Sequence, residues 1–167
     1  MNAAWAAFLD LLLAPLPPDE ALWVRRAWVG HLERLLREEN SDPHRPDELR
    51  SAGADALLEA LTEHAQGGEP GWWLVLQVDW KAWDEVEWQA NLVVRTRGLP
   101  GPFRWHSREG EGVEDALAAF ATWLCPLNHR YLSWERGEDA HFGFVVPEAE
   151  VEPFVAAARR VGLDVSG

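Results

Sequence analysis

The chain lacks the cysteines and the histidine pairs that form disulfide bonds and metal sites. One cysteine, Cys125, stands in 167 residues, which excludes an internal disulfide bond and a zinc site made of several cysteines. The histidines form no His-x-His or His-x-x-x-His pair, so we expect no metal site and no other cofactor. Cys125 follows an apolar segment and precedes a proline, and we expect it to be a small buried side chain.

Motifs for phosphate binding and for nucleophilic catalysis are also missing. The chain contains neither a Gly-x-x-x-x-Gly-Lys-Ser/Thr loop nor a Gly-x-Gly-x-x-Gly turn, whose open backbone amides cradle phosphates. No serine stands in a Gly-x-Ser-x-Gly frame, where a sharp turn would expose it as a nucleophile. These motifs therefore identify no reaction, and whether the protein is an enzyme is left open.

Positive charge is scarce, with 15 lysines and arginines against 28 acidic residues and a formal net charge of −13. Such a surface repels phosphate backbones and anionic membranes, so we expect no nucleic acid and no membrane as partner. A basic protein partner or a small ligand is compatible with this charge. No apolar run approaches the roughly 18 residues of a membrane span, and the start of the chain lacks a basic signal region. We therefore expect a cytoplasmic protein, of undetermined oligomeric state.

Lysine is the rarest of the charged residues, because the chain has one, Lys81, beside fourteen arginines and no isoleucine. A compact ammonium and a planar guanidinium are not interchangeable in a specific contact. The sequence therefore singles out Lys81, although the survival of one lysine by chance is the simpler explanation.

Residues 71–98 are the most informative stretch and hold five of the eleven tryptophans. Apolar side chains alternate with others from Trp72 to Trp80 and again from Trp88 onward, which predicts two strands of a β-hairpin. A register in which paired residue numbers sum to 168 places Trp80 opposite Trp88 and Leu76 opposite Leu92 on one buried face. Four tryptophans are expected in the core, namely Trp80, Trp88, Trp123 and Trp134, whereas Trp73 and Trp83 are expected to be exposed.

The same register places polar side chains on the reverse face of this hairpin. Lys81 would lie opposite Glu87, and opposite charges across two strands contribute roughly 0.2–1 kcal/mol. The predicted binding surface consists of Asp79, Lys81, Trp83, Glu87, Gln89 and Asn91. An ordinary solvated face with no ligand is the alternative interpretation.

The remaining patterns predict an α+β fold for a single domain, residues 1–167, with a helical subregion in residues 1–66 and an α+β subregion in residues 71–167. Three helices come first, and the segments around residues 40–46 and 66–71 are loops. A helix at 113–124 and a second hairpin at 130–146 follow. The last helix is expected to start between residues 148 and 153, and a short strand near 163–165 comes after it. The predicted sheet has four to five mostly antiparallel strands in the order β-β-α-β-β-α, with helices on one face.

Three functions fit these features. We expect most a non-catalytic module that binds a protein or a small ligand through the hairpin surface; small acidic, tryptophan-rich α+β proteins include bacterial immunity proteins, an analogy of composition alone. One alternative is a hydrolase-type enzyme that uses Asp79, Lys81 and Glu87 with a histidine, for which His129 and His141 could meet across the second hairpin. Another is carbohydrate binding through exposed indoles.

Overall fold

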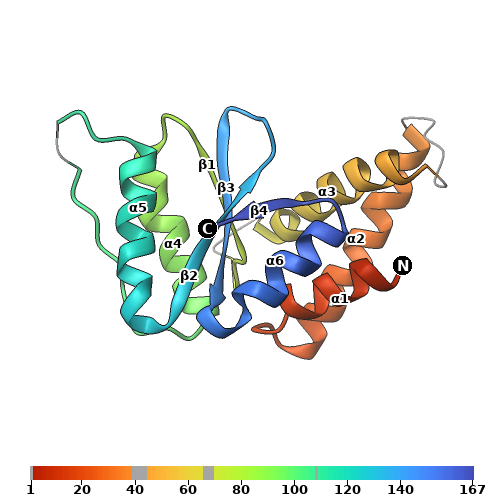
Figure 1. The fold of residues 1–167 in the computed structure, drawn as a ribbon, viewed down its shortest axis with the longest axis horizontal. Coiled ribbons are helices and arrows are strands. Elements are labelled where there is room, and N and C mark those ends of the chain that lie inside the picture. The colour runs from red at the N-terminus through yellow and green to blue at the C-terminus, as the bar shows by residue number, and fades with distance from the viewer. Residues whose placement is uncertain (1, 39–44, 66–69, 108) are drawn as a thin grey trace. The chain divides into compact units, whose positions relative to one another are not determined.

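The chain divides into two compact units, and each is described by itself (Figure 1). The computed structural model describes residues 2–38, 45–65, 70–107 and 109–167. One unit comprises Met1–Pro70 with Ala156–Leu163, and the other comprises Gly71–Val155 with Asp164–Gly167. The predicted loops at 40–46 and 66–71 lie largely outside the described residues. That the whole chain forms one domain stays a prediction.

The first unit contains the three predicted N-terminal helices, which are confirmed. They are α1 (Ala3–Leu12), α2 (Pro18–Glu38) and α3 (Pro46–Thr62), followed by a short 3₁₀ turn, Glu63–Ala65. The Asn2 side chain accepts a hydrogen bond from the backbone N–H of Trp5 at 3.0 Å and caps α1. Asp19 and Glu20 lie in the first turn of α2, where the helix dipole favours negative charge.

The three helices meet at Gly53 of α3. The rings of Trp5 and Trp28 lie 4.9 Å apart between their centroids, and the Trp28 indole N–H donates to the Gly53 carbonyl at 3.0 Å. A Cβ at position 53 would lie 2.5 Å from the Trp5 ring. Because glycine has no side chain, α3 can approach both indoles closely.

The second unit is built on a four-stranded antiparallel sheet, which confirms the predicted α+β class. The strands are β1 (Val75–Asp79), β2 (His129–Glu135), β3 (Ala140–Pro147) and β4 (Asp164–Ser166), in the order β1-β3-β2-β4. The β2–β3 pair is the predicted second hairpin, and β4 is the predicted short terminal strand. β1 therefore lies at one edge of the sheet.

Helices α4 (Trp83–Thr96) and α5 (Val113–Leu124) pack side by side on one face of this sheet (Figure 1). Register places Leu76, Val78 and Tyr131 on this face, and Phe120 of α5 contacts Tyr131. On the opposite face Phe144 contacts Phe154 in the first turns of α6 (Val151–Arg160), with ring centroids 5.5 Å apart. Short 3₁₀ turns, Cys125–Leu127 and Glu148–Glu150, precede β2 and α6.

The predicted hairpin in residues 71–98 is wrong, because its second strand is the helix α4. Leu76 pairs with Gly143 of β3 and not with Leu92. Residues 88–94 alternate as a strand would, but Val86, Ala90 and Val93 also recur at helical spacing, and all three are fully buried. Residues 83–96 form a helix because this spacing directs one apolar stripe at β1 and α5. The strand that pairs with β1 is β3, in place of the predicted second strand of the hairpin.

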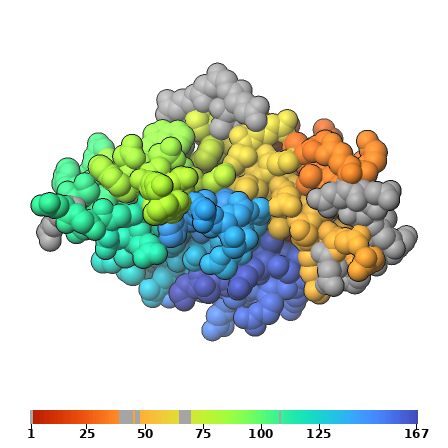
Figure 2. Space-filling model, turned by 90° about the horizontal axis from the view of Figure 1, so that it is seen from above, coloured from red at the N-terminus to blue at the C-terminus, as the bar shows by residue number. Residues whose placement is uncertain are grey.

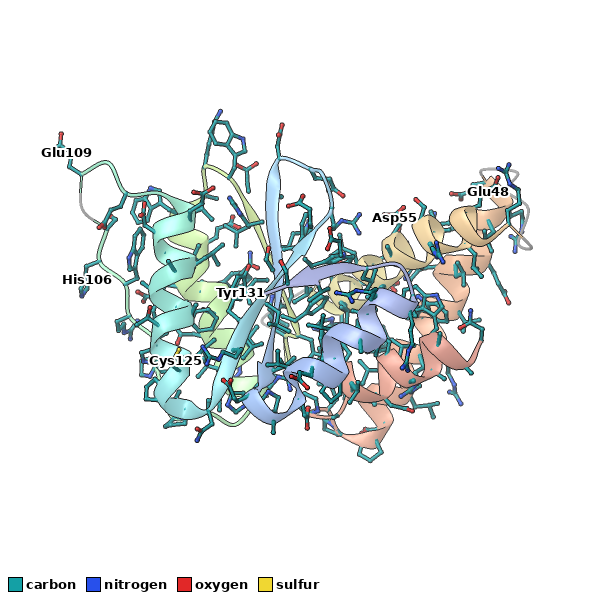
Figure 3. All side chains as sticks on the ribbon, in the orientation of Figure 1. Glu48, Asp55, His106, Glu109, Cys125 and Tyr131 are labelled. Carbon is teal, nitrogen blue, oxygen red and sulfur yellow. The ribbon has the colours of Figure 1, made fainter. Side chains whose placement is uncertain are left out.

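A glycine in β3 makes room for the chain's single tyrosine. The Tyr131 ring covers Gly143 on the face that α4 and α5 cover, and the Tyr131 hydroxyl donates to the Phe142 carbonyl at 3.2 Å (Figure 3). A Cβ on Gly143 would lie 2.4 Å from the nearest Tyr131 ring atom. Burial raises the pKa of the Tyr131 hydroxyl far above its usual range, so the ring stays neutral.

Cys125 is exposed, so the expectation of a buried cysteine is wrong (Figure 3). It follows the last residue of α5, where its Sγ contacts the Ala121 carbonyl at 3.3 Å and the Arg130 guanidinium at 3.6 Å. Cys125 lies one position beyond the buried Leu124 and outside the buried stripe of α5, which includes Leu117 and Phe120, so its side chain faces solvent.

Candidate functional site

Three large indoles are exposed where β1 passes into α4. Trp80 is 54% exposed, Trp83 is 41% and Trp88 is 51%. The predicted exposure of Trp83 and the predicted burial of Trp134 are confirmed. The predicted burial of Trp80 and Trp88 is wrong, and so is the predicted exposure of Trp73, which is buried. Trp123, expected in the core, is half-buried. Trp88 is exposed because, on a helix, it lies away from the stripe of Val86, Ala90 and Val93.

We call Asp79, Trp80, Lys81, Trp83, Asp84 and Trp88 the β1–α4 surface. In Figure 2 the yellow-green atoms of this segment lie on the face turned to the viewer, beside the blue atoms of the β2–β3 turn. The Trp80 backbone N–H donates to the Asp139 carbonyl of that turn at 3.4 Å. Backbone pairing thus continues one residue beyond β1 and fixes where Trp80 emerges.

The Asp79 carboxylate shapes the turn between β1 and α4. Its Oδ1 accepts a hydrogen bond from the Lys81 backbone N–H at 2.9 Å, and the Ala82 N–H donates to the Asp79 carbonyl at 2.9 Å. The Lys81 ammonium lies 4.3 Å from the centroid of the Trp80 ring, within the range of a cation–π interaction. Lys81 and Asp79 are both exposed.

The other two exposed indoles each rest against a second tryptophan. Trp83 meets Trp105 edge to face at 5.7 Å between ring centroids, and Trp88 contacts the buried Trp73 at 5.9 Å. An indole held by another ring loses less conformational freedom on binding than a mobile side chain does. These contacts therefore restrict the motion of the Trp83 and Trp88 side chains.

Glu87 does not face Lys81, because the strand that would have placed it there is helical. One Glu87 oxygen forms an ion pair with Arg104 at 2.7 Å, and the other accepts a hydrogen bond from the Trp105 backbone N–H at 2.8 Å. The Trp105 hydrogen bond, followed by the one from Arg104, lowers the pKa of Glu87 below its ordinary value of 4.5. Glu87 thus anchors the loop that follows α4 and stays ionised at neutral pH.

Replacing Glu87 with glutamine is expected to flatten the acid limb of the stability profile. A carboxyl whose pKa is lowered on folding stabilises the folded state above its unfolded pKa, and this contribution disappears as the pH falls through the folded value. The midpoint of urea denaturation, measured below pH 5 and at pH 7, should therefore depend less on pH in Glu87→Gln than in the wild type. Glu152→Gln, an equal charge change at an exposed position, is the control; an unchanged acid limb in Glu87→Gln would contradict this assignment.

Gln89 does not belong to the predicted binding surface, because its side chain is 3% exposed and binds the protein's own backbone. Its Oε1 accepts from the Gln77 N–H at 2.8 Å, and its Nε2 donates to the Gln77 carbonyl at 2.6 Å. Both groups belong to the outer side of edge strand β1. The amide therefore occupies the place that a further strand would take.

The Asn91 side chain binds the backbone of the loop that follows α4, as the Gln89 side chain binds the backbone of β1. Its Oδ1 accepts from the Phe103 N–H at 2.8 Å, while its Nδ2 donates to the carbonyls of Phe103 at 3.0 Å and Glu87 at 2.8 Å. Glu87 and Asn91, one helical turn apart, thus hold the backbone of residues 103–105 against α4. Both polar atoms of the Asn91 amide are thus engaged within the protein.

The proposed approach of His129 and His141 is wrong. His129 pairs with Pro147 at one end of β3, and His141 pairs with Val78 near the other end. Glu87, engaged by Arg104 and Trp105, also lies outside any such cluster. Within the described ranges, no group of three or more histidine, cysteine or acidic side chains is arranged to hold a metal ion.

Arg97, just after α4, has a strongly shifted pKa and lies outside the β1–α4 surface. Burial lowers its pKa from 12.5 to about 10, against a smaller opposing effect of Glu150. Its Nε and Nη2 are buried without a hydrogen-bond partner. The guanidinium still carries its charge at neutral pH, so burying these nitrogens without a partner destabilises the fold.

The chain matches one protein family over nearly its whole length. Residues 4–167 align with DUF6630, a domain of unknown function. The chain belongs to the DUF6630 family. No curated protein and no solved structure matches it. In the part of this DUF6630 domain that the structure describes, no helix has the length and apolar character needed to cross a bilayer.

Proposed function

We propose that this DUF6630 domain is a non-catalytic module that binds a basic protein partner through the β1–α4 surface. The observation that carries the proposal is the exposure of Trp80, Trp83 and Trp88 between 41% and 54%. Tryptophan is among the residues most enriched at the energetic centres of protein interfaces. Apolar groups gathered on one exposed segment are typical of an interaction surface.

Charge supports a basic partner. Residues 79–88 contain four carboxylates, Asp79, Asp84, Glu85 and Glu87, and a single ammonium, Lys81. The chain as a whole carries a formal net charge of −13. A positively charged protein would be steered to this surface at low ionic strength, and an acidic one would be repelled.

The two other functions considered from the sequence have less support. A hydrolase that uses Glu87 needs a carboxylate free to exchange protons, but the hydrogen bonds from Trp105 and Arg104 lower its pKa. Carbohydrate binding uses an exposed indole with polar side chains beside it that contact hydroxyl groups, and the amides of Gln89 and Asn91 are already engaged. A glycan array would detect this second activity.

The test is to purify the partner from the native host, identify it by mass spectrometry and reconstitute the complex from pure proteins. We expect a basic protein whose affinity falls at least about tenfold in the double variant Trp83→Ala/Trp88→Ala and falls with added salt. Trp23→Ala removes a 37% exposed indole of α2 and is the matched control. An acidic partner, or equal binding by the double variant and the wild type, would exclude the proposal.

A further inference from the structure

A hollow of about 340 Å³ lies beside Trp80. Three elements of the second unit line it: the residue after β1, the start of β3 and the start of α5. Its lining residues are Trp80, His141, Gly112, Val113, Glu114 and Asp115. None of the hydrogen-bonded side chains Glu87, Gln89 and Asn91 lines it, so its walls are separate from the contacts that hold the loop.

The walls of the hollow are suited to a cation. The Trp80 indole is 54% exposed and already lies 4.3 Å from the Lys81 ammonium, so its ring is available to a positive charge. Glu114 is exposed, and no ion pair or hydrogen bond engages its carboxylate among the described residues. An aromatic face and an unengaged carboxylate together bind cationic side chains.

An anion would fit less well, although the hollow adjoins a helix N-terminus. Asp115 Oδ2 accepts from the Gly112 N–H at 2.8 Å, so a side chain of the protein already occupies this amide. The carboxylates of Glu114 and Asp115 add two negative charges at the same place. They oppose the attraction of the helix dipole for an anion.

We infer that this hollow receives an arginine side chain of the basic partner, stacked on Trp80 and paired with Glu114. The inference rests on the proposed function and deepens it. Arginine fits better than lysine because its planar, weakly hydrated guanidinium stacks on an indole and binds a carboxylate through two parallel hydrogen bonds. Lys81 does not line the hollow, but its ammonium lies 4.3 Å from the centroid of the same ring, so its charge opposes that of the incoming guanidinium.

The inference can be tested with a defined probe, the capped peptide Gly-Gly-Arg-Gly-Gly. The indole N–H resonances of the full chain are recorded by ¹H–¹⁵N NMR during titration, with Trp80 assigned from the variant Trp80→Phe. We expect a saturable shift of the Trp80 resonance and no comparable shift of Trp23. The same peptide with citrulline, a neutral isostere of arginine, should bind at least about threefold more weakly.

Charge variants distinguish binding of the peptide in the hollow from its general electrostatic attraction to an acidic protein. Lys81→Met should tighten arginine-peptide binding about threefold, and Glu114→Gln should weaken it about threefold. Glu152→Gln is the matched control, because Glu152 is an exposed glutamate in the first turn of α6 as Glu114 is in the first turn of α5. Unchanged thermal unfolding in all three variants shows that folding does not explain the differences.

Three results would overturn the inference: an unmoved Trp80 resonance, equal binding of the citrulline peptide, or equal weakening by Glu114→Gln and Glu152→Gln. Each would leave the proposed function standing, because partner binding is measured independently through Trp83 and Trp88. Conversely, a partner that binds the Trp83→Ala/Trp88→Ala variant as tightly as the wild type would exclude the proposed function. The Trp80 titration would still test whether the hollow binds arginine.

Discussion

Replacing Gln89 with leucine is expected to lower the free energy of unfolding by about 2–3 kcal/mol. The leucine fits the buried site but leaves the N–H and the carbonyl of Gln77 without the partner that now satisfies both. Leaving a partly buried backbone group unsatisfied costs about 1–3 kcal/mol, and water reaching the opened edge offsets part of the loss. Urea denaturation measures the change.

Hydrogen exchange tests the same contact locally. The Gln77 amide proton should exchange much faster in Gln89→Leu, while the amide protons of Leu76 and Val78, which point toward β3, should keep their protection. Gln77→Thr is the control, because the exposed Gln77 side chain takes no part in these bonds and its replacement should change stability by less than about 0.5 kcal/mol. Equal stability of Gln89→Leu and the wild type would show that the amide is dispensable.

Without the Gln89 amide, the edge of β1 is also expected to pair with strands of other chains. Exposed N–H and carbonyl groups of an edge strand are a template for strand addition, and proteins normally cover them. Gln89→Leu should therefore self-associate at high concentration in sedimentation velocity experiments, more than Gln77→Thr does. The Gln89 amide would then be the group that prevents another strand from pairing with the β1 edge.

Replacing Gly143 with alanine is expected to destabilise the second unit by about 2–3 kcal/mol. The added Cβ would lie 2.4 Å from the Tyr131 ring, which is held by Phe120 of α5 and by the hydrogen bond to the Phe142 carbonyl. The ring must move, and α5 must move with it or lose contact. Chemical denaturation followed by near-ultraviolet circular dichroism measures the change.

Two further variants make this prediction specific. Tyr131→Leu removes the part of the ring that meets the new Cβ, so Gly143→Ala should be much less destabilising in that background, which a double-mutant cycle quantifies. Gly30→Ala should raise stability by about 0.5–1 kcal/mol, because Gly30 lies in α2 and a Cβ added there would meet no atom within 4 Å. Loss of stability in both backgrounds by the same amount would show that Tyr131 is not the obstacle.

Much of the fold follows from local signals in the sequence. Prolines and acidic residues mark the starts of α2 and α3, and Pro126 marks the end of α5. The turn at Gly137, flanked by two alternating segments, identifies the β2–β3 hairpin. These features depend on residues within a few positions of each other, so the sequence alone specifies them.

The conformation of residues 83–96 was decided by the tertiary structure. Apolar residues there satisfy both the strand and the helix period, and the β-branched Val93 and Val94 by themselves favour a strand. Packing on β1 and α5 favours the helix, and that choice alone exposes Trp88 and buries Gln89. The error in the predicted binding surface follows from this one segment.

For the β1–α4 surface, the sequence by itself determined that the chain is acidic, that tryptophans gather near its single lysine, and that Trp83 is exposed. Only the tertiary structure decided that Glu87, Gln89 and Asn91 bind the protein's own backbone and that Trp80 lines a hollow with Glu114. The physical reason is that hydrogen-bond partners such as Gln77 and Phe103 are far away in sequence, and no periodic pattern encodes which polar side chain will meet them.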